Sequence, residues 1–165
     1  MSEAIISFLQ SHGIPREIII AVISMLPVME LRLGLIAASV LGVPLARAFA
    51  VCFLANILPI PLILLFVKQI FTLMKKHAVF PGLVTRLEKS ALRKSGAIKE
   101  KLFVGLFLFV AVPLPGTGAW TGALIAALIG LPVRRSFFTI AAGVLGAGLI
   151  MIILTYFIPG LFGFK

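Results

Sequence analysis

Glu30 and Arg32 are the only charged side chains in the interior of the apolar stretch formed by residues 17–41. A charge at bilayer depth costs ~2.5–3.5 kcal/mol or more, so it is expected to face a cavity or a partner. Arg32 suits an anionic head group, and Glu30 suits a group that takes up and releases a proton. The alternative is an internal ion pair that only lets the segment insert. Pro27 interrupts the same stretch, so we count Pro27, Glu30 and Arg32 as candidate substrate-binding residues.

A second candidate cluster is a turn formed by Pro115, Gly116, Thr117 and Gly118, with Trp120 following it. The exposed N–H groups of a short helix that begins there would cradle an anion. Thr117 would add a hydroxyl, and Trp120 would cap a cavity or lie along a lipid tail. The alternative for Trp120 is an anchor at the membrane interface.

Asn56 is the one amide in residues 48–67, the first predicted crossing helix, which Pro59 and Pro61 loosen. It would line the site or make an interhelical hydrogen bond. The sequence has no zinc-protease motif, no phosphate-binding loop and only one cysteine, Cys52. We therefore expect neither an enzyme nor a cofactor or metal site.

The segments 26–49 and 114–137 are two copies of one pattern, 88 positions apart, as Leu26 and Leu114 show. The other matches are Pro27/Pro115, Gly34/Gly122, Ala38/Ala126, Gly42/Gly130, Pro44/Pro132, Arg47/Arg135 and Phe49/Phe137. Duplicated, proline-broken helices in a membrane protein point to a transport site between two halves.

Composition defines the class of protein. The 165 residues are 61% hydrophobic and 12% charged, with a mean hydropathy of +1.22, whereas a soluble domain is roughly 25% charged. Four apolar runs, at 17–41, 48–73, 102–129 and 136–158, each exceed the ~20 residues that span a bilayer. We expect an all-α integral membrane protein without a cleavable signal peptide. Residues 2–11 are expected to form a short interfacial helix.

The formal net charge of +10 is concentrated in residues 68–101, which hold nine of the fifteen basic side chains. Such a loop is expected on the cytoplasmic side, with residues 83–94 as an amphipathic helix on an anionic leaflet. Without interleaved aromatic residues, nucleic-acid binding is not expected.

The runs 17–41 and 102–129 are each broken near the middle. In the second run, eleven apolar residues on each side of the break make arms of about 16 Å, roughly half the hydrocarbon thickness. We therefore predict two inverted repeats, each a re-entrant helical hairpin followed by one transmembrane helix; the alternative is a kinked four-helix bundle. The predicted single domain comprises an N-terminal segment (1–15), repeat 1 (16–67), the basic linker (68–101), repeat 2 (102–158) and a tail (159–165).

The motifs at residues 27–34 and 113–122 resemble those of the small multi-drug export family, a distant relative of the DedA (VTT-domain) membrane proteins. The resemblance implies a multi-pass protein of the prokaryotic plasma (inner) membrane. The DedA side implies flipping of phospholipids or undecaprenyl phosphate, often with ion coupling. DedA proteins carry acidic residues in the first motif, where Glu30 fits. They carry arginines in the second, where this chain has Thr117 and Trp120 and places its arginine at Arg32.

The leading expectation is a transporter that moves an amphipathic, anionic, lipid-like substrate between leaflets, with possible proton or sodium coupling. The alternatives are a small multidrug exporter of lipophilic compounds and a non-transporting membrane scaffold. Because one short chain shields a polar pathway thinly, we also predict a homodimer among membrane lipids.

Overall fold

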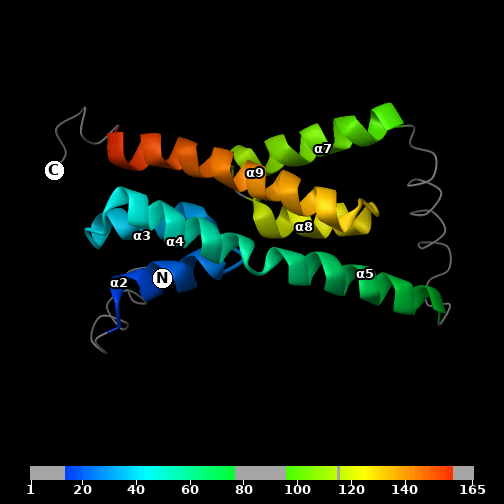
Figure 1. The fold of residues 1–165 in the computed structure, drawn as a ribbon, viewed down its shortest axis with the longest axis horizontal. Helices are drawn as coiled ribbons and strands as arrows, with labels where there is room; N and C mark the ends of the chain where they lie inside the picture. The colour runs from blue at the N-terminus through cyan, green and yellow to red at the C-terminus, as the bar shows by residue number, and fades with distance from the viewer. Residues whose placement is uncertain (1–13, 77–95, 115, 158–165) are drawn as a thin grey trace. The chain divides into compact units, whose positions relative to one another are not determined.

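The computed structural model describes residues 14–76, 96–114 and 116–157, and all regular structure in these ranges is helical (Figure 1). The helices are α2 (Arg16–Met25), α3 (Glu30–Val40), α4 (Leu45–Ile57), α5 (Ile60–Lys76), α7 (Gly96–Ala111), α8 (Ala119–Leu128), α9 (Val133–Ile152) and the π-helix η1 (Ile153–Phe157). The prediction of an all-α protein is confirmed for this part of the chain. The predicted helices at 2–11 and 83–94 lie outside the described residues.

Both broken runs are interrupted where the prolines and glycines predict. The first run divides into α2 and α3, with Leu26 in an extended conformation (φ −73°, ψ 139°), because a proline disfavours helical backbone in the residue before it. The second divides into α7 and α8 around residues 112–118. Helices α5 and α7 extend to Lys76 and from Gly96, so helix continues into both ends of the segment 68–101.

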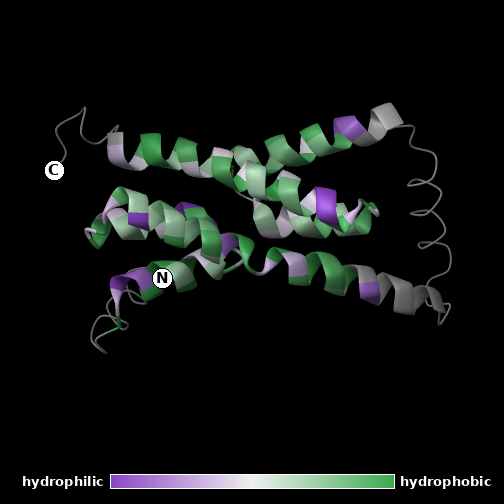
Figure 2. Cartoon of the chain, in the orientation of Figure 1, coloured by the Kyte–Doolittle hydropathy of each residue, from purple (hydrophilic) through white to green (hydrophobic). Residues whose placement is uncertain are grey.

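Two helical stretches are long and apolar enough to cross a membrane. Helices α4 and α5 together give Leu45–Val67, 23 residues, with a turn at Leu58 and Pro59, and α9 with η1 gives Val133–Tyr156, 24 residues. Each exceeds the ~20 residues required for the hydrocarbon core. Figure 2 shows that apolar residues dominate both stretches.

The chain divides into two compact units, which we describe separately. Unit 1 comprises Met1–Leu58 and Val144–Lys165, and unit 2 comprises Pro59–Gly143. In unit 1, α2, α3 and α4 pack on one another and α3 contacts η1, whereas in unit 2, α8 packs on α5 and α7. Each unit therefore contains one copy of the repeated segment and the last part of the long helical stretch that follows the other copy.

The two copies end their short helices with the same backbone motif. Gly42 (φ +66°) and Gly130 (φ +70°) both adopt the left-handed conformation that glycine accommodates best. The N–H of the next residue then donates to the carbonyl of a residue in the last helical turn. These bonds, both 2.9 Å, run from Val43 to Ala38 and from Leu131 to Ala126. Both connections are thus Schellman-type caps.

Candidate functional site

Glu30 combines burial with an unusual backbone conformation. It is 6% exposed, begins α3 and has φ +51°, the one positive φ of a non-glycine residue in the described part of the chain. For a side chain with a Cβ atom this region costs roughly 1–2 kcal/mol. The equivalent position in the second copy is Gly118, which also has positive φ (147°). The fold therefore holds a carboxyl group where the repeat otherwise uses glycine.

Arg32 lies two residues further along α3 and is half-buried. The Glu30 carboxyl interacts electrostatically with its guanidinium. Pro27, in the exposed turn just before them, terminates α2 and sets the start of α3. The three candidate residues of the first turn are thus gathered at the beginning of one helix, with two opposite charges near each other.

Gly34 lies where α2, α3 and α4 approach one another closely. It lies one helical turn after Glu30 on α3, and both residues are buried. A Cβ atom on Gly34 would overlap the Ser24 Oγ of α2 and would lie 3.0 Å from the Cys52 Sγ of α4. Because glycine leaves this space open, the Ser24 hydroxyl and the Cys52 thiol both reach the face of α3 that carries Glu30.

Asn56 and Tyr156 extend this polar region. Asn56 is 2% exposed and follows Cys52 by one turn on α4, and the Tyr156 hydroxyl, from η1, interacts electrostatically with Cys52. The Asn56 Oδ1 and the Tyr156 hydroxyl are buried without a hydrogen-bond partner among the described residues. Each such orphan costs about 1–3 kcal/mol, so a ligand or water that supplies partners is favoured here.

We name this region the polar cluster, comprising Glu30, Ser24, Cys52, Asn56 and Tyr156. All five residues belong to unit 1. At the positions 88 residues after Glu30, Ser24, Cys52 and Asn56, the chain has glycine or apolar residues, namely Gly118, Val112, Ile140 and Val144. The duplicated scaffold thus carries this polar chemistry once.

The turn predicted at Pro115–Gly118 lies in unit 2, and the hydroxyl of Thr117 makes hydrogen bonds within it. The Thr117 Oγ1 lies 2.8 Å from the carbonyl oxygens of Val112 and Leu114, which share its single proton as acceptors, and it accepts the Leu114 N–H at 3.2 Å. It therefore closes the turn. Gly116 (φ +80°) is exposed and Gly118 is buried before α8.

Trp120 is half-buried in the first turn of α8, two residues after Gly118. Pro115 lies outside the described residues. Since this turn and the polar cluster belong to different units, we treat them as separate features.

Ser24 and Tyr156 were not among the sequence candidates. Ser24 is one of two serines in the apolar run 17–41, and Tyr156 is the only tyrosine of the chain. Tyr156 belongs to a π-helical turn, a distortion that is frequent at functional sites. Hydroxyl groups in apolar segments indicate candidate site residues, but the approach of Ser24 and Tyr156 to Cys52 depends on helix packing.

The end of unit 1 that holds the starts of α2 and α4 is fixed by polar contacts. The Arg16 Nη1 donates to the carbonyl of Leu41 at 2.8 Å, which caps α3. The Arg47 Nη1 donates to the Glu17 Oε1 at 3.2 Å in an exposed ion pair. The Glu17 backbone N–H, and then the Arg47 side chain, lower the pKa of the Glu17 carboxyl.

Within the described ranges, no three His, Cys, Asp or Glu side chains lie close enough together to hold a metal ion. The polar cluster consists chemically of a carboxyl, an amide, two hydroxyls and a thiol, with the guanidinium of Arg32 nearby. Such a set binds the polar head of a ligand through hydrogen bonds and charge.

All regular structure in the described residues is helical, and the two long apolar stretches are typical of a membrane protein. The profile of the family described as "Putative small multi-drug export protein" matches residues 30–150, most of the chain, and the chain belongs to that family. No curated protein and no solved structure matches it. The matched region begins at Glu30 and includes Arg32, Cys52 and Asn56.

Proposed function

We propose that this protein is a membrane transporter that moves an amphipathic, anionic, lipid-like substrate between leaflets, with the polar cluster and Arg32 as its head-group site. Lipid phosphates such as undecaprenyl phosphate, and phospholipids, are the substrate class. The observation that carries the proposal is Glu30, a buried carboxyl at a strained backbone position where the second copy has glycine. Backbone strain of this kind clusters at active sites and ligand-binding sites.

The roles of the residues follow from their chemistry. Arg32 pairs with a phosphate through its planar, permanently charged guanidinium. The Tyr156 hydroxyl donates to an oxygen of the head group, and the amide oxygen of Asn56 accepts from a head-group hydroxyl or a protonated phosphate. Glu30 would exchange a proton, or pair with a sodium ion, as the substrate enters and leaves, which gives a route to ion coupling.

The architecture that we propose is a pair of inverted repeats with re-entrant hairpins. Helices α2, α3 and α8 contain 10, 11 and 10 residues, about 15–17 Å each, which is half the hydrocarbon thickness. The exchange of long-helix ends between the two units supports such a repeat pair. In this arrangement the segment 68–101 and Arg134 face the cytoplasm of a prokaryotic cell, and Arg47 faces outward.

Single-cysteine labelling in intact cells tests this topology. Cys52 is the only cysteine, so a Cys52→Ala background permits one introduced cysteine at a time. We expect Arg47→Cys to react with an impermeant maleimide from outside and Arg134→Cys to react only after permeabilisation. Outside labelling of Arg134→Cys would instead indicate a kinked four-helix bundle.

Export of lipophilic cations is a second candidate function, which the family description and the buried Glu30 carboxyl favour. Here Glu30 would bind the substrate and Arg32 would oppose it. The two candidates therefore assign opposite roles to two neighbouring residues. A distant relationship to DedA proteins remains a prediction from the resemblance.

Ligand-dependent thermal stability separates the candidates. The purified protein is heated with undecaprenyl phosphate, phosphatidylglycerol or tetraphenylphosphonium, alongside Arg32→Ala and Glu30→Gln. A rise in Tm with the lipid phosphate that disappears in Arg32→Ala is expected. A rise with the cation that disappears in Glu30→Gln would favour drug export, and no selective ligand would favour a non-transporting scaffold.

We further expect a homodimer and no catalytic activity. A second copy would help to shield a polar head group, since unit 1 surrounds the polar cluster with only a few short helices. Native mass spectrometry of the detergent-solubilised protein measures the assembly directly. A pure monomer at all concentrations would contradict the prediction.

A further inference from the structure

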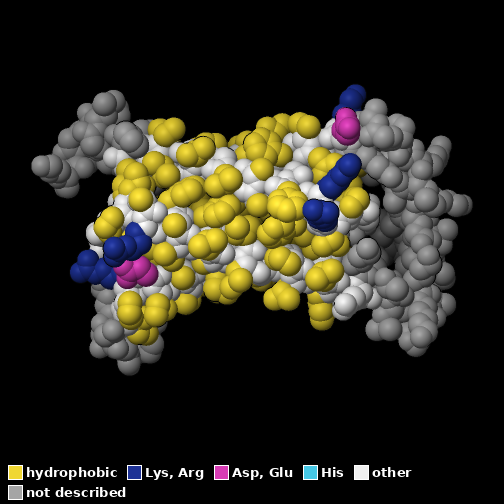
Figure 3. Space-filling model, viewed as in Figure 1, with side chains coloured by type: hydrophobic (Ala, Val, Ile, Leu, Met, Phe, Trp, Pro, Cys, Tyr) yellow, Lys and Arg dark blue, Asp and Glu magenta, His cyan; other side chains and the backbone are white. Residues whose placement is uncertain are grey.

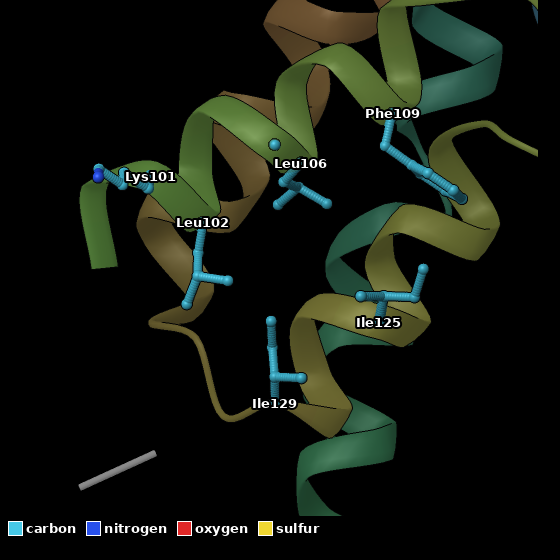
Figure 4. A pocket seen from close by; sticks show the side chains of 7 residues that line it. Lys101, Leu102, Leu106, Phe109, Ile125 and Ile129 are labelled. Atoms are coloured by element: carbon cyan, nitrogen blue, oxygen red, sulfur yellow. The ribbon is translucent and has the colours of Figure 1, made fainter. Parts of the chain in front are cut away.

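An apolar groove runs between α7 and α8 in unit 2 (Figure 4). Its volume is about 220 Å³, and six of its lining residues are Leu102, Gly105, Leu106, Phe109, Ile125 and Ile129. The side chains of α7 and α8 face each other across an open space in this view. Gly105 contributes to the opening, because a Cβ atom built on it meets nothing within 4 Å.

The groove has one charged end and one hydrocarbon end. Lys101, which is exposed, lines the end that also includes Leu102 and Ile129, and Phe109 lies at the other end with Ile125. Eight residues separate Lys101 from Phe109 on α7, which corresponds to about 12 Å of helix. One leaflet of hydrocarbon is roughly 15 Å thick, so an ammonium group at the interface leaves the rest of the groove within that leaflet.

The surroundings of the charged end are basic. Arg134 and Arg135 are exposed at the start of α9, shortly after α8 ends, and Glu100 is the one acidic residue described in unit 2. Figure 3 shows Lys and Arg side chains gathered over the starts of α7 and α9. The charge at this end of the groove therefore complements an anionic group.

We propose that this groove holds an acyl chain of a membrane phospholipid with an anionic head group, whose phosphate pairs with Lys101. The leucine, isoleucine and phenylalanine side chains contact the chain, and the ammonium group donates hydrogen bonds to phosphate oxygens. This lipid is a resident of unit 2. It is distinct from the transported substrate, so the inference does not depend on the proposed function of the polar cluster.

Native mass spectrometry of the full-length protein in detergent tests the site, with added phosphatidylglycerol or phosphatidylcholine as the two probes. We expect phosphatidylglycerol to be retained roughly fivefold more strongly, the effect of one lysine on a lipid with net negative charge, because the choline of phosphatidylcholine neutralises its phosphate. Lys101→Gln is expected to abolish the preference. Arg47→Gln is the matched control, since it removes the same charge from an exposed site in unit 1.

Gly105→Leu tests the groove itself, because the Cβ of the added side chain meets no atom within 4 Å and the leucine would occupy the groove that Gly105 lines. Retention of both lipids is expected to fall in Gly105→Leu and to remain unchanged in Val104→Leu, an exposed neighbour that does not line the groove. Circular dichroism is used to check that both variants fold. Unchanged lipid retention in Gly105→Leu, or equal retention of the two lipids by the wild type, would overturn the proposal.

Discussion

Glu30 and Gly118 occupy equivalent positions in the two copies of the repeated segment, and both have positive φ, +51° and +147°. Glycine adopts such angles without steric cost, whereas glutamate does not. The first copy therefore carries a glutamate at a position whose backbone conformation favours glycine. Beyond the copies the contrast continues, since the amide of Asn56 and the thiol of Cys52 stand 88 positions before Val144 and Ile140.

Replacing Glu30 separates backbone strain from charge. Glu30→Gln and Glu30→Gly both remove the carboxylate, but only glycine adopts the positive φ without steric cost. We expect Glu30→Gly to be more stable than Glu30→Gln by about 1 kcal/mol, measured by thermal unfolding in one detergent. Both variants should lose ligand-dependent stabilisation. Equal stability would show that residue 30 is not strained in the folded protein.

Gly34 and Ser24 should be energetically coupled. The Cβ of Gly34→Ala would overlap the Ser24 hydroxyl, so we expect a loss of about 1–3 kcal/mol. In a Ser24→Ala background the same substitution should cost at least 0.5 kcal/mol less, on the order of a contact-pair coupling. A double-mutant cycle in unfolding free energy measures this difference. Strict additivity would contradict the close contact between α2 and α3.

Gly143 and Gly105 should respond in opposite directions to alanine. A Cβ on Gly143 would lie 2.7 Å from the Val110 Cβ and 3.1 Å from the Phe107 carbonyl oxygen. Gly143→Ala should therefore destabilise the protein by about 1–3 kcal/mol. Gly105→Ala meets open space and should be neutral or stabilising by up to about 1 kcal/mol, through helix propensity. Thermal unfolding of the two single variants checks this pair.

The Glu17–Arg47 ion pair predicts a small acid-sensitive contribution to stability. Because the Glu17 backbone N–H and Arg47 lower the pKa of the folded-state carboxyl, the contribution is complete above the ordinary glutamate pKa of about 4.3. It is lost as the pH falls through the lowered value. The Tm difference between wild type and Glu17→Gln should thus be present at neutral pH and vanish at strongly acidic pH. A difference that persists there would indicate a packing role for Glu17.

Sequence alone located the breaks that shape this fold. Pro27 and the Pro113–Gly118 segment predicted where α2 and α7 end, since proline removes a backbone donor and clashes with the preceding turn. The repeat predicted equivalent connections, which the caps at Gly42 and Gly130 display in hydrogen bonds. These features depend on a few neighbouring residues, and local chemistry is what a sequence pattern reports.

The polar cluster was predicted only in part. Glu30 and Asn56 were recognisable as polar residues at apolar positions, but Ser24 and Tyr156 lie more than a hundred residues apart in the chain. Their approach to Cys52 depends on long-range packing, which hydrophobic periodicity does not encode. The strain at Glu30 could have been predicted from the sequence, because alignment of the two copies places Glu30 opposite Gly118.

The capped connections at Gly42 and Gly130 also have a mechanical consequence. Each closes its corner with backbone hydrogen bonds, so α3 with α4, and α8 with α9, form stiff elbows that resist bending. Glu30 is the first residue of α3. A ligand held by its carboxyl would therefore act on α3 and α4 together.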